Sequence, residues 1–65
     1  MTLDEIGMAF AQACHEQGFA GFSLRTTDEG DVRMVGLSLP PSLVAYMLRA
    51  AADAYEEQVT EGRVN

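Results

Sequence analysis

The sequence predicts a single α+β domain, 1–65, of order α-β-β-α, in which an antiparallel hairpin packs against two helices in two layers. Three observations predict it. Apolar residues recur at helical spacing near both ends of the chain, they alternate at period two in its middle, and a run of Asp, Glu and Gly separates the two alternating segments. The last residues, 62–65, are expected to form a disordered tail.

The first helix is predicted over residues 2–17. The opening Thr2-Leu3-Asp4-Glu5 matches the S/T-x-x-E capping box, in which the first hydroxyl accepts from the fourth amide while the acidic side chain reaches back. Gly18 predicts a left-handed stop, with Phe19 folding back onto Cys14 in a Schellman-type contact. The expected core-facing stripe, apolar except at its last position, comprises Leu3, Ile6, Phe10, Ala13, Cys14 and Gln17.

A β-hairpin is predicted next, with strands at about 19–27 and 32–39. Asp28-Glu29-Gly30-Asp31 lies between them and supplies residues that are typical of turns. Pro40-Pro41 ends the second strand, because proline cannot donate a hydrogen bond to a strand ladder.

Two registers are open for this hairpin, and a slip of one residue moves every side chain to the other face. A three-residue loop closed by Gly30 is slightly favoured by turn chemistry and pairs Leu24 with Met34. A loop of two or four residues pairs Leu24 with Val35 instead. This second register is preferred, because it places six apolar side chains on one face, namely Ala20, Phe22, Leu24, Val35, Leu37 and Leu39.

The register also decides what two arginines do. With the three-residue loop, Arg25 lies directly opposite Arg33, a like-charge pair that costs stability unless an anion or a carboxylate lies between them. In the preferred register they project from opposite faces, and the carboxylates of Asp28, Glu29 and Asp31 neutralise each one separately. An anion clamp within one subunit is therefore compatible only with the first register.

The second helix is predicted at about 41–61, with Ser42 as a candidate N-cap and Gly62 as its end. Its apolar face is wider than one sheet face requires. That face comprises Leu43, Val44, Met47, Leu48, Ala51, Ala54, Tyr55 and Val59. The solvated side comprises Arg49, Asp53, Glu56 and Glu57.

Both helices are expected on the apolar face of the hairpin, which leaves Val32 and Met34 on an open face between unpaired strand edges. A homodimer would cover this face and the excess apolar width of the second helix, either edge to edge or through the second helices. The alternative is a small monomer whose helices cover each other. The expected oligomer interface comprises Val32, Met34, Ala45, Arg49 and Ala52.

Composition disfavours several classes of function. Ten acidic residues face four basic ones, none of them lysine, and the net charge of −6 opposes direct binding to nucleic acid. The single cysteine, Cys14, excludes an internal disulfide and predicts a cytoplasmic protein, and no targeting or membrane-spanning segment is recognised.

No catalytic residue, metal site or cofactor is expected, so the chain is predicted not to be an enzyme. Adjacent helical side chains point about 100° apart, so Cys14 and His15 do not face each other as a nucleophile and its base would. Cys14 is interpreted as core and His15 as surface. Asp28, Glu29 and Asp31 lack the spacing of a calcium loop and are interpreted as turn residues.

In size, acidity, compactness and lack of lysine, the chain resembles the small inhibitor proteins of bacteriophages and mobile elements, of the anti-CRISPR and anti-defence type. The resemblance implies binding to a host protein without catalysis. The first hypothesis is accordingly an acidic protein-binding module that occupies a basic patch on a larger partner. Its expected partner-binding residues are Arg25, Asp28, Glu29, Asp31, Val32, Met34, Asp53, Glu56 and Glu57. The alternatives are an oligomer whose subunits join Arg25 and Arg33 around a phosphate or nucleotide, and an antitoxin-like regulatory subunit.

Overall fold

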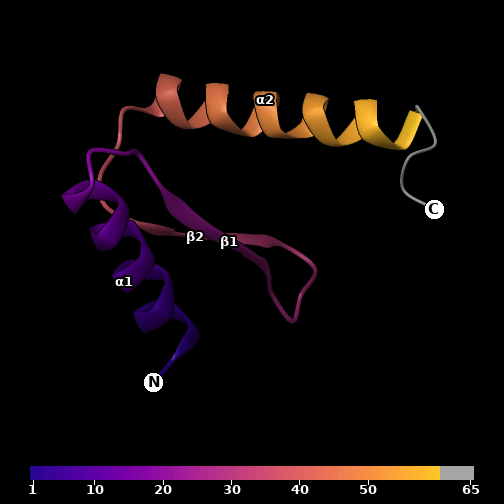
Figure 1. Cartoon of the computed structure of the whole chain (residues 1–65). Helices are drawn as coiled ribbons and strands as arrows, with labels where there is room; N and C mark the ends of the chain where they lie inside the picture. The colour runs from indigo at the N-terminus through magenta and orange to yellow at the C-terminus, as the bar shows by residue number, and fades with distance from the viewer. Residues whose placement is uncertain (61–65) are drawn as a thin grey trace.

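A computed structural model describes residues 1–60 of the chain. Its elements, in order, are α1 (Leu3–Glu16), β1 (Phe22–Thr26), β2 (Val32–Gly36) and α2 (Pro41–Thr60) (Figure 1). The α+β class and the α-β-β-α order are confirmed, with strands shorter than predicted. The expected last residue of the second helix, the stop at Gly62 and the tail at 62–65 lie outside the described residues.

The start of α1 carries the predicted capping box. The amide of Glu5 donates to Thr2 Oγ1 at 3.1 Å, and the amide of Thr2 donates to Glu5 Oε1 at 2.7 Å. Two of the amide groups that a helix start leaves unpaired are thereby satisfied. Thr2 is the N-cap, so the helix begins one residue later than predicted.

The end of α1 carries the predicted Schellman motif. Gly18 has a φ of 86°, and its amide donates to the carbonyl of His15 at 3.0 Å. The amide of Phe19 donates to the carbonyl of Cys14 at 2.8 Å. This pair of bonds turns the chain sharply away from the helix axis and starts it toward the hairpin.

The hairpin adopts the register with the three-residue loop, which does not collect the apolar side chains on one face. Leu24 lies opposite Met34, so the preferred pairing of Leu24 with Val35 is wrong. Gly30 has a φ of 86°, and its amide donates to the carbonyl of Thr27 at 3.0 Å, as a three-residue loop requires. Turn chemistry therefore decides the register.

Helix α1 covers the hairpin face that carries Ser23 and Val35. A Cβ built on Gly7 would lie 2.2 Å from Ser23 Oγ and 3.3 Å from Val35 Cβ, so the helix backbone contacts the strands directly. Gly7 and Ala11 are the buried residues of α1, and Ala11, 1% exposed, is the only buried hydrophobic side chain among the described residues. The core has little volume because it is formed by small residues such as Gly7 and Ala11.

The predicted core stripe of α1 is wrong at most of its positions. Leu3, Ile6 and Phe10 are exposed, because the helix is rotated to place Gly7 and Ala11 against the sheet. Of the stripe, only Cys14 is half-buried. Close approach of the helix and strand backbones through small residues outweighs burial of the larger side chains.

Helix α2 leaves the rest of the molecule after its first turn. Pro41 occupies the first helical position, and the carbonyl of Pro40 accepts from the amides of Leu43 and Val44 at 3.0 and 3.1 Å. Ser42 is therefore inside the helix, and Pro40 takes the capping place. Every residue from Leu48 to Val59 is exposed.

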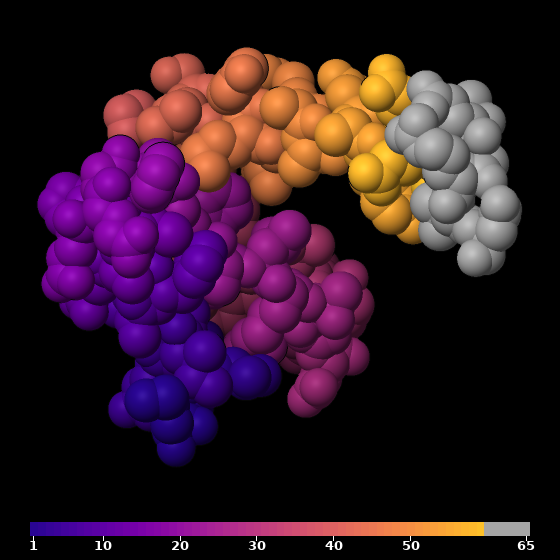
Figure 2. All heavy atoms as spheres, in the orientation of Figure 1, coloured from indigo at the N-terminus to yellow at the C-terminus, as the bar shows by residue number. Residues whose placement is uncertain are grey.

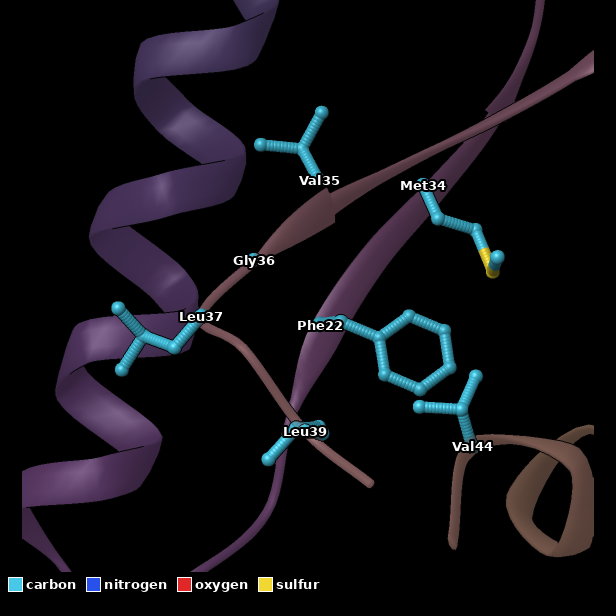
Figure 3. A pocket seen from close by; sticks show the side chains of 7 residues that line it. All are labelled: Phe22, Met34, Val35, Gly36, Leu37, Leu39 and Val44. Atoms are coloured by element: carbon cyan, nitrogen blue, oxygen red, sulfur yellow. The ribbon is translucent and has the colours of Figure 1, made fainter. Parts of the chain in front are cut away.

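The expectation that both helices share one hairpin face is wrong. Val44, in the first turn of α2, lies beside Phe22 and Met34, on the face opposite to the one that α1 covers (Figure 3). Beyond this turn α2 packs against no other described element (Figure 1). The Cα radius of gyration is 13.8 Å, against about 11 Å for a compact chain of this length.

Candidate binding surfaces

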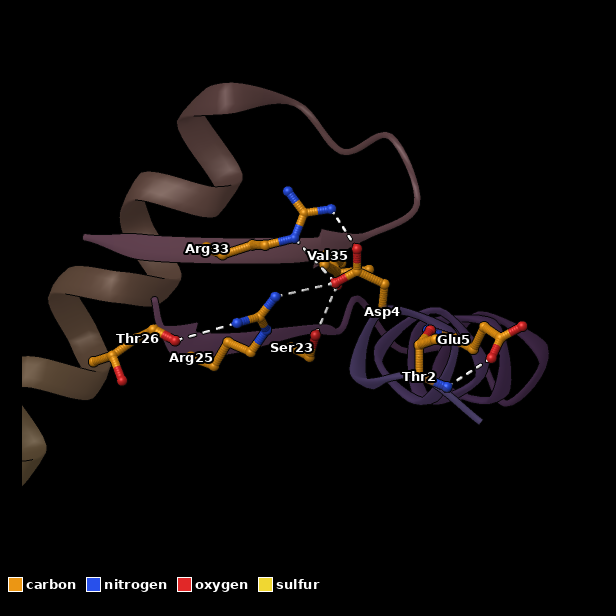
Figure 4. A network of polar contacts seen from close by, with 8 residues as sticks. All are labelled: Thr2, Asp4, Glu5, Ser23, Arg25, Thr26, Arg33 and Val35. Atoms are coloured by element: carbon orange, nitrogen blue, oxygen red, sulfur yellow. Dashed lines mark hydrogen bonds and ion pairs between the residues drawn. The ribbon is translucent and has the colours of Figure 1, made fainter. Parts of the chain in front are cut away.

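The two hairpin arginines meet a carboxylate from α1. Arg33 donates from Nε to Asp4 Oδ1 at 3.0 Å and from Nη2 to Asp4 Oδ2 at 2.6 Å, a bidentate pair. Arg25 Nη2 lies 3.5 Å from the same Oδ1 (Figure 4). Asp4 therefore lies between two arginines that face each other across the strands.

This arrangement resolves the like-charge pair within the chain. The hydrogen bond from Arg33, followed by the charges of both arginines, lowers the pKa of Asp4 although burial opposes it. Asp4 in turn raises the pKa of Arg33. All three side chains are well exposed, so the network serves mainly to set the position of α1 on the hairpin.

The loop carboxylates do not neutralise the arginines, contrary to the prediction for the preferred register. Asp28, Glu29 and Asp31 are exposed at the hairpin tip, and no ion pair within residues 1–60 involves them. The amide of Asp31 donates to Thr27 Oγ1 at 3.1 Å, which steadies the turn. The tip is thus an uncompensated acidic surface.

A second acidic surface lies on α2. Asp53, Glu56 and Glu57 are exposed along its outer half, and no ion pair in the described part of the chain involves them. The hairpin tip and this part of α2 belong to separate arms of the molecule (Figure 1). The predicted acidic residues therefore form two groups.

The predicted apolar contact residues Val32 and Met34 are exposed on the hairpin face that α1 leaves open, which we call the outer face. Phe22 and Leu24 share this face, because they alternate with Ser23 along β1. Leu24 is also exposed, whereas Phe22 is half-buried beside Val44. The outer face is thus largely apolar, and residues 1–60 leave most of it uncovered.

The outer face and α2 bound an open cleft. Its inner end is a pocket of about 200 Å³ at the point where α2 leaves the hairpin (Figure 3). The pocket is lined by Phe22, Met34, Val35, Gly36, Leu37, Leu39 and Val44. Farther out the two walls separate, and Figure 2 shows open space between the atoms of α2 and those of the hairpin.

The apolar stripe of α2 faces this cleft. Val44 points toward Phe22 and Met34 (Figure 3). At about 100° per helical residue, six later positions of the helix lie within about 60° of Val44, namely Gln58 and five apolar residues. The apolar residues are Met47, Leu48, Ala51, Tyr55 and Val59. Both walls of the cleft are therefore apolar, and beyond the pocket nothing in the described chain lies between them.

The other predicted interface residues flank this stripe. Ala45 is half-buried, and Ala52 and Arg49 are exposed. On the same helical geometry they lie about 80° to 140° from Val44, at one rim of the apolar surface. Of the predicted interface residues, Met34 therefore lies in the cleft, opposite the apolar stripe of α2. Ala45, Arg49 and Ala52 lie beside that stripe on the helix.

Sequence reasoning missed one exposed apolar row. Leu3, Ile6 and Phe10 follow one another along α1 and are exposed, whereas the sequence pattern predicts them to be core. The signal that could have found them is the pair Gly7 and Ala11, one turn apart, which marks the side on which a helix backbone can approach a sheet closely.

Cys14 and His15 have different surroundings. Cys14 is half-buried, and a Cβ built on Gly21 would lie 2.5 Å from its Sγ, so the thiol packs against the chain leading into β1. His15 is exposed.

Within residues 1–60, no three His, Cys, Asp or Glu side chains are grouped as a metal site would need. None of the helices in that part of the chain combines the length and apolar character that crossing a bilayer requires.

Comparison with protein-family models, with curated proteins and with solved structures finds no match for this chain.

Proposed function

We propose that the chain is a non-catalytic protein-binding module that occupies an apolar groove with a basic rim on a larger protein. The observation that carries this proposal is the row of Leu3, Ile6 and Phe10, exposed on a helix that is capped at both ends and seated on the hairpin. Their spacing of i, i+3 and i+7 is the one with which a helix places anchors in a groove.

The acidic residues set the rate of association and the choice of partner. The chain carries a net charge of −6, and exposed carboxylates accelerate encounter with a positively charged surface. Asp28, Glu29 and Asp31 project from the hairpin tip, free of ion pairs within residues 1–60. Affinity comes from the apolar anchors, because rim charges contribute mainly to association.

The remaining proposed contacts are those that the sequence indicates. They are Arg25, Val32, Met34, Asp53, Glu56 and Glu57. Of these, Val32 lies beside the hairpin tip, opposite Thr26, and joins an apolar side chain to the acidic turn. A module of this kind acts by covering a surface, as the phage and mobile-element inhibitors that the chain resembles do.

Asp4 weighs against the anion-binding alternative. Its carboxylate already receives three guanidinium contacts from Arg25 and Arg33, so a phosphate would have to displace it. The helix-anchored protein contact requires no such rearrangement.

Affinity capture tests the proposal. The immobilised chain is exposed at low ionic strength to a lysate of the cell in which it acts, and Ile6→Glu is compared with Gln12→Glu. Both positions are exposed on α1 and lie about 120° apart. We expect a specific protein to be retained by wild type and Gln12→Glu, to be lost by Ile6→Glu, and to be released as salt rises. Failure to retain any specific protein, or equal retention by Ile6→Glu, refutes the proposal.

A further inference from the structure

We propose that the cleft between the outer face and α2 is filled by α2 of a second copy of this chain. Two copies would then form a two-fold dimer in which the α2 helices lie antiparallel between the two hairpins. The proposal concerns a different surface from the anchors on α1, and it does not depend on the proposed function. In the dimer, Met34 and Glu56 contact the second copy and not the larger protein.

The apolar surface of α2 is wider than one neighbouring surface requires. Measured from Val44, apolar side chains extend from Ala50 on one side to Ala45 on the other, an arc of about 220° that is interrupted only by Gln58. A helix that covers a single surface needs an apolar stripe of about 100° or more. An arc twice as wide fits a helix with two neighbours, here a second α2 and a hairpin.

Within residues 1–60, nothing fills the cleft beyond the pocket. The walls meet only where Val44 lies beside Phe22 and Met34, and they diverge from there (Figure 2). Folding α2 back onto its own hairpin would cover one part of its apolar arc and leave the rest in water. A second α2 covers that part as well, and by symmetry each copy gains the same contact.

The chain exposes more surface than a compact monomer of its mass. The accessible surface of the 65-residue chain is 5300 Å², whereas a folded monomer of 7.0 kDa exposes about 4000 Å². The excess of about 1300 Å² per copy is larger than the 800 Å² or so that each partner contributes to a stable interface. The excess accessible surface is therefore large enough for a stable dimer to bury.

The charges at the rim of the apolar arc select the antiparallel orientation. Arg49 lies in the first half of α2 and Glu56 in the second, and both lie at one rim of the apolar arc, about 120° to 140° from Val44. Antiparallel helices bring the same rim of each copy together, so Arg49 faces Glu56 of the second copy. Parallel helices would instead place acidic second halves side by side.

A matched pair of tyrosine variants tests the dimer. Tyr55 and Tyr46 are 64% and 66% exposed, so a charge at either position leaves the fold of a single copy intact. Tyr55 lies in the stripe that faces the cleft, and Tyr46 lies about 160° away from Val44. Tyr55→Glu would bury a carboxylate in the dimer, whereas Tyr46→Glu would leave it in water.

The measurement is molar mass by light scattering over a dilution series, with circular dichroism as the check of folding. We expect wild type and Tyr46→Glu to have twice the 7.0 kDa mass of the chain. Tyr55→Glu should dissociate at concentrations at least about tenfold higher than wild type does. A wild-type mass of one chain, or equal dissociation of the two variants, overturns the proposal. Since Tyr55 and Ile6 lie on different elements, a wild-type chain that has the mass of one copy and still captures its partner refutes this inference alone.

Discussion

Replacing Gly7 with alanine tests how α1 sits on the hairpin. Gly7 is buried, and its backbone contacts the strand face directly. The added Cβ would lie 2.2 Å from Ser23 Oγ, 3.1 Å from Ser23 Cβ and 3.3 Å from Val35 Cβ. Rotation of Ser23 can move its hydroxyl, at the expense of its 3.2 Å hydrogen bond to the carbonyl of Val35. The two Cβ atoms belong to the strands and cannot rotate away.

Two opposing effects set the change in the free energy of unfolding of Gly7→Ala. Alanine is better than glycine inside a helix by about 1 kcal/mol. Overpacking by one methyl group costs about 1–3 kcal/mol, because the helix must move away from the sheet by a few tenths of an ångström. We therefore expect Gly7→Ala to lower the free energy of unfolding by about 1 kcal/mol, or to lower the melting temperature by about 4–8 °C.

The assay is urea and thermal denaturation followed by circular dichroism, at one fixed protein concentration because association would shift both transitions. Ala9→Gly, at an exposed position of the same helix, measures helix propensity alone and should cost about 1 kcal/mol. A Gly7→Ala variant that is more stable than wild type by about the same amount would show that no strand atom opposes the methyl group. The described packing of α1 would then be wrong.

The remaining predictions concern the ion pairs, the turn and the cap. The pKa of Asp4 lies below its ordinary 3.8, so its stabilisation is complete above that pH and is lost as pH falls through the lower folded value. Asp4→Asn leaves Arg25 facing Arg33, so the variant should be less stable near neutral pH, and urea melts from about pH 6 to pH 2 should show a weaker loss on acidification than wild type. Gly30→Ala should lower the free energy of unfolding by about 1–2 kcal/mol in the same melts, because a φ of 86° is strained for alanine. Packing adds nothing to this cost, since no atom lies within 4 Å of the added methyl group. Thr2→Ala should cost about 1 kcal/mol of stability and reduce the helical signal; an unchanged melt would contradict the capping box.

The parts of the fold that depend on neighbouring residues could be predicted from the sequence. The capping box at Thr2, the left-handed Gly18 and the loop glycine Gly30 each act through bonds or torsions within a few residues. Their signals are local, and all three are present in the structure.

The parts that depend on packing could not be predicted in the same way. The preferred register requires that the hairpin has one apolar face, and the predicted stripe of α1 requires that the largest apolar side chains of the helix are core. The structure uses Gly7 and Ala11 for the contact, and it leaves Phe10 and Leu24 exposed on different sides of the molecule. Hydrophobic periodicity does not distinguish a side chain that is buried in its own chain from one that is buried by a partner.

The ion pairs illustrate the same limit. The sequence indicates that Arg25 opposite Arg33 needs a carboxylate between them, and this register is the one observed. The sequence does not indicate that Asp4, in the first turn of α1, supplies that carboxylate. Its position follows from the rotation of α1, which close packing at Gly7 sets.

Cross-linking between two distinguishable copies tests the filled cleft most directly. Leu24→Cys on the outer face of a tagged chain is mixed with Tyr55→Cys in an untagged chain, both carrying Cys14→Ala, and a short bismaleimide is added. The dimer predicts a cross-linked product that contains one chain of each kind, and little of it when Tyr46→Cys replaces Tyr55→Cys. Equal yields from the two tyrosine positions, or no mixed product, would contradict a cleft filled by α2 of a second copy.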